Sequence, residues 1–274
     1  MASEPVLSPA VEASLAESLR RATLLEGSPA GPLEILYSGG LDSSVLAWIL
    51  RERPHTSLMT VGLADSPDIL AAAAGAQLIG LPWRPVLVDL GGVEAGWERW
   101  KHAIGDARDP CASVQLALAL ALESASASSI LLGQGADELF WGYARYRGLT
   151  AEAGDRLAVT DLARLIDVDL PRTRTIAGAC GREIRLPYLN PEFREQLAGV
   201  GSRAHMSRER SKPLLRRLAL HLGVAESLRE QPKRAMQYGS RVAATLRKVQ
   251  RDAARPSAAE YPRPMGLIPA RRHA

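Results

Sequence analysis

A seven-residue segment that follows a short apolar stretch constrains the fold of this chain most. The segment reads Ser38-Gly39-Gly40-Leu41-Asp42-Ser43-Ser44, the preceding LEIL favours a β-strand, and the following VLAWIL has apolar residues at helical spacing. Glycines let a backbone approach an anion closely, and a helix N-terminus offers unpaired N–H groups to phosphate. The segment therefore predicts a phosphate-binding loop, although it matches neither the Walker pattern nor G-x-G-x-x-G.

Asp42 places a carboxylate in the first turn of the expected helix. A bare carboxylate would repel phosphate, whereas carboxylate oxygens are good ligands for Mg²⁺. We therefore expect Asp42 to hold a magnesium ion that in turn binds the phosphates.

Short apolar stretches and helical stretches alternate through the first half of the chain. Further strands are expected at Ser57–Leu63, Arg84–Leu90 and Ser128–Gly135, and the helices between them at Asp65–Gly80, Glu94–Ile104 and Cys111–Ser124. This alternation is typical of βαβ units, in which helices cover both faces of a parallel sheet. The predicted fold class is α/β.

The second half of the chain reads differently. No convincing strand is expected beyond Ala136, and residues 150–254 read as successive amphipathic helices, for example Asp161–Ile166 and Lys212–Leu222. We expect an N-terminal helix within residues 1–30, opened by Ser8-Pro9, a catalytic domain over 31–254 whose helical part follows about residue 149, and a poorly ordered tail over 255–274.

Composition limits the classes of protein that this chain belongs to. There is no apolar run long enough for a membrane span and no signal peptide, and two cysteines without a C-x-x-C pair suit the cytoplasm. From Gly201 onward, 17 Lys and Arg stand against 5 Asp and Glu. Such a basic region is able to contact nucleic acid, but it would equally surround a polyphosphate or form a solvated surface.

Further motifs, in order along the chain, carry a resemblance to a known family. The string LGQGADELFWGY (132–143) at the end of the fourth expected strand is similar to the G-x-G-[SA]-D-E-x-x-x-G-Y signature of the asparagine synthetase synthase domain, which β-lactam synthetases share. GREIRLPYLN (181–190), KPLLR (212–216), Pro232-Lys233 and Gly239-Ser240 resemble the family's later motifs. With the glycine loop, which resembles that of the adenine-nucleotide α-hydrolase-like enzymes, the matches span about residues 33–240.

The resemblance implies a role for each matching residue. Asp42 and Asp137 would be the Mg²⁺ ligands. The pyrophosphate of ATP would be held by the loop residues Ser38, Gly39, Gly40, Ser43 and Ser44. Adenine and ribose would be lined by Tyr37, Val61 and Gly133. Three residues would take part in catalysis: Lys233 by stabilising negative charge, Lys212 as a second phosphate contact, and Gln134 beside the reacting groups.

Two departures from the family bear on the substrates. Asparagine synthetases carry a glutaminase domain that begins with Met-Cys, whereas this sequence begins Met1-Ala2-Ser3 and has about 30 residues before the first strand. We therefore expect no glutamine hydrolysis within the chain. Residue 134 is usually acidic in asparagine synthetases and tyrosine in β-lactam synthetases; here it is Gln134, which puts the identity of the carboxylate in question.

The function that the resemblance implies is an ATP-dependent ligase that adenylates a small carboxylate and transfers the acyl group to an amine. The amine would be ammonia, part of the substrate, or supplied by a separate donor or carrier protein. Two alternatives stay open. The basic C-terminal third allows a tRNA-modifying adenylating enzyme, although the acidic motif argues against it, and Gln134 allows a non-catalytic ATP-binding partner subunit.

Overall fold

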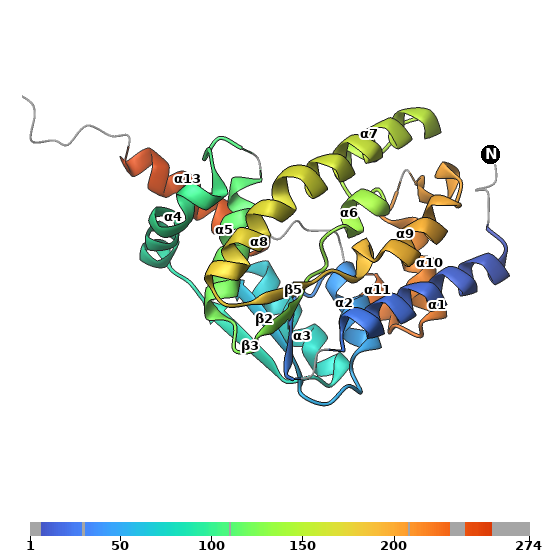
Figure 1. Ribbon diagram of the computed structural model, residues 1–274, viewed down its shortest axis with the longest axis horizontal. Coiled ribbons are helices and arrows are strands. Elements are labelled where there is room, and N and C mark those ends of the chain that lie inside the picture. Colours follow the sequence, from blue (N-terminus) through green and yellow to red (C-terminus); the bar gives the residue numbers. More distant parts are fainter. Residues whose placement is uncertain (1–6, 29–30, 110, 208, 231–238, 254–274) are drawn as a thin grey trace, which may run out of the picture.

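The computed structural model describes residues 7–28, 31–109, 111–207, 209–230 and 239–253 (Figure 1). Its centre is a parallel sheet of five strands in the order β3-β2-β1-β4-β5. The strands are β1 (Leu33–Leu36), β2 (Thr56–Gly62), β3 (Trp83–Leu87), β4 (Ser129–Leu131) and β5 (Glu183–Arg185). The predicted α/β class with a parallel sheet is confirmed.

Helices cover both faces of this sheet, so the strands bury side chains in two separate cores. Ile35 and Leu58 pack in one core, and their neighbours Leu36 and Met59 pack in the other. Successive residues of a strand point to opposite faces, and both faces here are covered. The inner strands β1, β2 and β4 are therefore buried along almost their whole length rather than at alternate residues.

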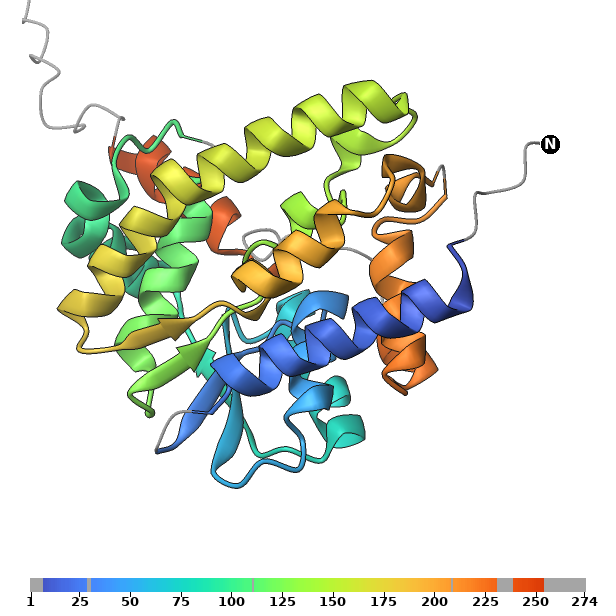
Figure 2. The same cartoon turned by 45° about the vertical axis from the view of Figure 1, so that its right-hand side comes forward.

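The first core is closed by the N-terminal helix and by helices of the second half of the chain. In Figure 2, α1 crosses in front of the sheet and packs against α9 and α10. The helices of this side are α1 (Pro9–Glu26), α2 (Leu41–Ile49), α3 (Pro67–Ile79), α9 (Pro191–Ala198), α10 (Pro213–His221) and α11 (Glu226–Arg229).

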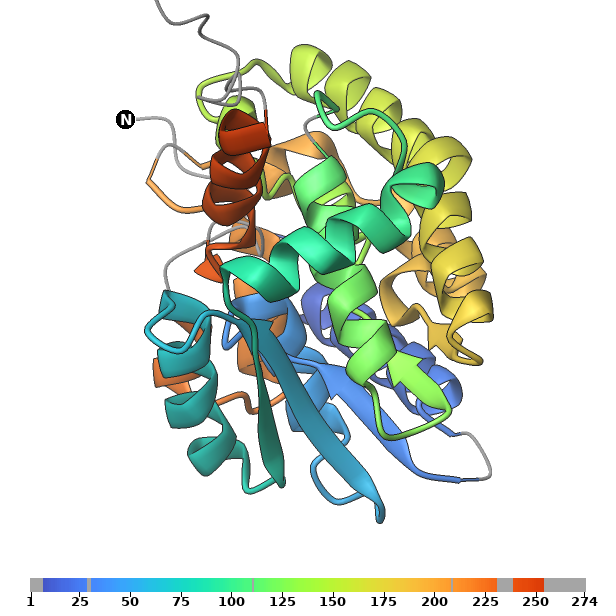
Figure 3. The same ribbon diagram turned by 90° about the vertical axis from the view of Figure 1, so that its left-hand side faces the viewer.

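The second core lies on the other face, where α4, α5 and α13 lie side by side (Figure 3). This side is formed by α4 (Leu90–Ile104), α5 (Ala112–Ser124), α8 (Leu170–Ala179) and α13 (Val242–Ala253). A long helical rod, α7 (Ala151–Arg164) followed by the π-turn η2 (Leu165–Asp169), leads into α8. The short elements α6 (Ala136–Leu139), η1 (Ala144–Tyr146), η3 (Pro187–Leu189) and η4 (Ser202–His205) complete the described chain. No described helix combines the length and the apolar character that crossing a membrane requires.

One sequence-based expectation about the sheet was wrong. We expected no strand beyond Ala136, yet β5 pairs in parallel with β4 at the sheet edge. The strand is three residues long, and Glu183 is exposed and forms a surface ion pair with Arg185. An edge strand is paired on one side only and is more exposed than a central strand. Its sequence therefore contains fewer of the apolar residues by which a central strand is recognised. The expected tail, 255–274, lies outside the described residues.

We predict that His205 makes the stability of the helical half depend on pH. Its imidazole stacks on Trp141, with ring centroids 5.7 Å apart, and burial lowers its pKa to about 4 from an ordinary value of 6.5. Between these values the unfolded chain binds a proton that the folded chain does not. The free energy of unfolding is therefore unaffected above pH 6.5 and decreases by about 3 kcal/mol as the pH falls from 6.5 to 4.

Urea unfolding of wild type and His205→Phe at each pH measures this effect. The difference between the two curves isolates His205, because Glu138, whose pKa burial raises to about 7, changes stability in the opposite direction. His102→Phe, a change at an exposed histidine, is the control and should follow the wild type. A His205→Phe profile parallel to that of the wild type would show that the buried imidazole has no such role.

Candidate functional site

The predicted phosphate loop lies at the carboxyl end of β1, where the chain turns into α2. Gly39 has a φ of 72°, and a Cβ atom there would lie 2.6 Å from the backbone of Ala71, so a larger residue would not fit. Gly40 caps α2, and Ser43 Oγ donates to the Gly40 carbonyl oxygen at 3.3 Å. The first turn of α2 leaves backbone N–H groups without helical partners, which suits an anion.

Tyr37 and Ser44 lie beneath this loop. Both side chains are fully buried, and the Tyr37 hydroxyl lies 3.2 Å from Ser44 Oγ. Burial raises the pKa of Tyr37, against the weaker effect of this hydrogen bond. The observed contacts of these two side chains support the loop from below, and their contact with nucleotide stays a prediction.

A second loop, after β4, approaches the first. A Cβ atom on Gly133 would lie 3.5 Å from Asp42 Cβ, which shows how closely the two loops approach each other. Gly135 has a φ of 94° and caps α6, whose first turn carries Asp137. A side chain at Gly142 would overlap with the Asp137 carboxylate, so the glycines of the motif are explained by close packing at this point.

Lys212 lies between the two carboxylates that the sequence singled out. Its Nζ atom is 2.5 Å from Asp42 Oδ2 and 2.8 Å from Asp137 Oδ1, and its side chain is 1% exposed. Burial lowers the pKa of Lys212, but Asp137 and Asp42 outweigh this effect and keep the pKa above its ordinary value. A charged, buried ammonium therefore joins the ends of β1 and β4 to the start of α10.

The donor set at this point fits a magnesium ion. Because Asp42 and Asp137 both contact one Lys212 atom, their oxygens lie close enough together to share a cation, and Asp42 Oδ1 is buried without a hydrogen-bond partner. Mg²⁺ binds oxygen ligands and usually takes only one or two carboxylates, with phosphate and water completing its shell. Accordingly, the described residues contain no cluster of three His, Cys, Asp or Glu that could hold a metal alone.

One cavity of about 770 Å³ joins most of the predicted residues. Eight of them line it: Tyr37, Ser38, Asp42, Ser43, Val61, Gly133, Gln134 and Asp137. Four others do not appear on its wall: Gly39, Gly40, Ser44 and Lys212. Lys233 lies outside the described residues, so its role stays a prediction.

Sequence reasoning missed a hydrogen-bonded pair in the same cavity. The Tyr143 hydroxyl donates to Glu138 Oε1 at 2.5 Å, and Glu138 is 8% exposed. Burial raises the pKa of Glu138 to about 7, although the hydrogen bond from Tyr143 opposes the shift, and burial also raises the pKa of Tyr143. Both residues stand in the 132–143 string, so the motif contained them, but nothing in it showed that their side chains meet.

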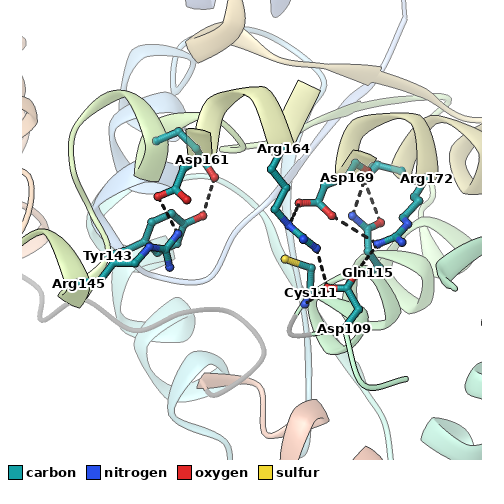
Figure 4. Close-up of polar contacts among 11 residues, drawn as sticks. Asp109, Cys111, Gln115, Tyr143, Arg145, Asp161, Arg164, Asp169 and Arg172 are labelled. Carbon is teal, nitrogen blue, oxygen red and sulfur yellow. Dashed lines mark hydrogen bonds and ion pairs between the residues drawn. The ribbon is translucent and has the colours of Figure 1, made fainter. Parts of the chain in front are cut away.

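Sequence reasoning also missed a row of charged pairs along α7 and η2 (Figure 4). Asp161 pairs with Arg145 at 2.7 Å, and further along the same rod Arg164 lies 3.5 Å from Asp169. All four residues line the cavity. Helical periodicity places Asp161 and Arg164 on one face, but the sequence did not reveal the turn that brings in Asp169.

Comparisons with known proteins show which family this sequence resembles. A family model described as Asparagine synthase matches residues 11–153 and 149–264. A putative asparagine synthetase (glutamine-hydrolyzing) of Methanocaldococcus jannaschii is 28% identical over 190 residues, 65% of this chain and 34% of that protein. The asparagine synthetase (glutamine-hydrolyzing) of Rattus norvegicus is 30% identical over 173 residues, 58% of this chain and 30% of its own length.

Asparagine synthetase domain-containing protein 1 of Homo sapiens is 34% identical over 127 residues, 43% of this chain and 20% of that protein. The chain thus spans about a third or less of the length of these three relatives.

We predict that Lys212→Met destabilises the protein and makes its stability depend on magnesium. Loss of the ammonium leaves Asp42 and Asp137 facing each other without a cation, which costs on the order of 3 kcal/mol for a buried pair. Because Mg²⁺ would replace the lost charge, it should restore part of that loss in the variant and change the wild type less. Urea unfolding with and without Mg²⁺, in the absence of nucleotide, measures both effects.

Lys101→Met is the matched control. Lys101 forms an exposed pair with Glu98, and such a pair contributes about 0.5 kcal/mol or less. If the magnesium effect is the same in Lys212→Met as in Lys101→Met, the two carboxylates do not form the metal site.

Proposed function

Because the chain belongs to the asparagine synthase family, a family of ATP-dependent ligases, we propose that it joins a small carboxylic acid to an amine with cleavage of ATP. A substrate carboxylate attacks the α-phosphorus of ATP, which gives an acyl-adenylate and pyrophosphate. The amine then attacks the acyl carbon, loses a proton and displaces AMP. The observation that carries this proposal is the convergence of Asp42 and Asp137 on one point, in the wall of a cavity that also contains the N-terminal turn of α2.

The first step depends on holding the phosphates in place. The free N–H groups of α2, together with the hydroxyls of Ser38 and Ser43, bind the pyrophosphate portion of ATP, while Val61 and Gly133 border adenosine. Magnesium, when bound by Asp42 and Asp137, neutralises charge on the phosphates. Lys212 lies next to the same point and supplies a further positive charge to them.

The attack of the amine, the second step, depends on the part of the cavity wall around Gln134. Its side-chain oxygen is buried without a hydrogen-bond partner, and the residue lines the cavity. A neutral amide donates and accepts hydrogen bonds, but it neither takes up a proton near neutral pH nor holds an ammonium ion as a carboxylate does. We therefore propose a carboxylate substrate other than aspartate, with ammonia, a separately delivered amine or an amine of the substrate itself as the nucleophile.

The test of this function is ATP–pyrophosphate exchange over a panel of carboxylic acids. Exchange that depends on one class of acid, followed by AMP formation when an amine is added, is the expected result. ATP binding without exchange for any acid would point instead to a non-catalytic partner subunit. Exchange that needs tRNA rather than a small acid would favour the nucleic-acid alternative, and a salt-dependent complex with tRNA would accompany it.

Asp42→Asn and Asp137→Asn should each abolish magnesium-dependent exchange, with a fall of about 10²-fold or more. Each change removes one of two convergent carboxylates, while Lys212 keeps its pairing with the other. Asp106→Asn, at an exposed carboxylate paired with Arg108, is the control and should exchange at the wild-type rate. Wild-type exchange in either site variant would mean that the metal is held elsewhere.

Gln134 provides a separate prediction about the substrate. Wild-type protein given ATP, aspartate and ammonium should form AMP and asparagine poorly, and Gln134→Glu should raise whatever aspartate-dependent turnover exists, because it restores a carboxylate beside the reacting groups. Quantifying AMP and asparagine measures both. Wild-type turnover of about 1 per second or faster would contradict the prediction and identify an ammonia-dependent asparagine synthetase.

A further inference from the structure

The π-turn η2 places two charged side chains together in a way that an α-helix would not. Residues five apart in an α-helix point about 140° away from each other around the axis. In η2 the Leu170 N–H donates to the Leu165 carbonyl, five residues back, and the wider turn brings Arg164 Nε to 3.5 Å from Asp169 Oδ2. Single π-turns of this kind occur frequently at functional sites.

Surrounding groups hold this pair rigidly (Figure 4). Asp109 accepts hydrogen bonds from Arg164 at 2.6 Å and from Arg172 at 2.8 Å. The backbone carbonyl of Asp169 accepts from Gln115 Nε2 at 3.0 Å and from Thr173 Oγ1 at 2.9 Å. These contacts position the Arg164 guanidinium and the backbone of Asp169 in the absence of a ligand.

One oxygen of this arrangement has no hydrogen-bond donor. Asp169 is 7% exposed, and its Oδ1 atom is buried without a hydrogen-bond partner. The Arg172 guanidinium lies 3.7 Å from Oδ1, which is beyond a hydrogen bond. Buried carboxylate oxygens are normally hydrogen-bonded, and Asp169 is one of the residues that line the cavity, so its carboxylate indicates a place for a ligand's donor group.

We propose that Asp169 and Arg164 form a specificity site for the carboxylate substrate, which carries an amino or hydroxyl group at the end remote from the adenylated carboxylate. This inference rests on the proposed function in one respect, namely that the ligand is a carboxylic acid. The donor group gives its N–H or O–H to Asp169, and Arg164 contacts the same group or its neighbour.

The charges around the site favour this ligand over two others. Two carboxylates, Asp109 and Asp169, face two guanidiniums, Arg164 and Arg172, so the cluster has no net charge. A second carboxylate on the ligand would lie against Asp169, and an apolar end would leave the Asp169 oxygen without a donor. Sites built to hydrogen-bond a substrate discriminate strongly against analogues that lack the group.

Cys111 offers a direct probe of this site. Its thiol contacts both Arg164 and Asp169, and it lines the cavity, whereas Cys180 is not among the lining residues. A ligand bound at Asp169 will slow alkylation of Cys111 by iodoacetamide but not that of Cys180. Mass spectrometry of the two cysteine peptides reports both rates in one sample, since the chain has only these two cysteines.

The panel consists of acids matched in length, with an amino group in place of a terminal methyl group. The pairs are β-alanine with butyrate, γ-aminobutyrate with valerate and δ-aminovalerate with caproate, and the ω-hydroxy acids of the same lengths form a second series. At least one donor-bearing acid should slow Cys111 alkylation tenfold or more while its methyl partner does not. Equal protection by both members of every pair, no protection by any acid, or protection by ATP alone would overturn the proposal.

Variants then assign the effect to Asp169. Asp169→Asn removes the negative charge with little change in shape. The ratio by which the amino-bearing acid protects Cys111 from alkylation better than its methyl partner should therefore fall at least tenfold. Asp167→Asn, at an exposed position of the same turn, is the control and should keep the wild-type preference. Retention of the full preference in Asp169→Asn would overturn the assignment.

Pyrophosphate exchange with the same acids separates this inference from the proposed function. Protection of Cys111 by an acid that gives no pyrophosphate exchange would support the specificity site and contradict the proposed adenylation. Pyrophosphate exchange that is equally fast with both members of each pair would support the proposed adenylation and contradict the specificity site.

Discussion

The contact of the Lys212 ammonium with Asp42 and Asp137 is the interaction on which the rest of this structure depends. It joins the loop after β1, the loop after β4 and the start of α10, three segments that are far apart in the sequence. A buried ammonium is stable only while its partners are present, and two adjacent carboxylates need a cation between them. Each of the three residues is therefore stabilised by the other two.

This dependence explains the backbone around the contact. Gly142 has no room for a side chain beside Asp137, and Lys212 itself adopts a φ of 56°, which is uncommon for a residue other than glycine. The ion pairs and the packing of α10 offset the free energy that this backbone conformation costs. The same three residues carry the proposed phosphate chemistry, so stability and activity are coupled at this point.

The two halves of the chain contribute different parts of the cavity. The sheet half supplies a glycine loop and helix N-terminus, which suit phosphate whatever the rest of the substrate is. The helical half supplies α7 and η2, whose alternating charges include Arg164 and Asp169. In the proposed function, the glycine loop and the start of α2 would bind the phosphates of ATP, whereas α7 and η2 would select the acid.

The sequence by itself determined the local features of this protein. Glycine turns at the ends of apolar strands, alternating with helical periodicity, predicted the parallel sheet, the phosphate loop and the position of Asp42, because each of these signals lies within a few residues of chain. The role of Asp137 was predicted only by the resemblance of its motif to a known family. Strand β5 was missed because a three-residue edge strand with an exposed Glu183 has almost no apolar pattern.

Only the tertiary structure decided which side chains meet. From the sequence, Lys212 could equally have been a solvated charge; its burial follows from where α10 packs, which no local pattern specifies. The position of the Asp169 oxygen that lacks a hydrogen bond likewise depends on a π-turn, whose single extra residue leaves no mark in the periodicity of α7 and α8. Burial and pairing are set by contacts between distant segments, and those contacts exist only once the chain has folded.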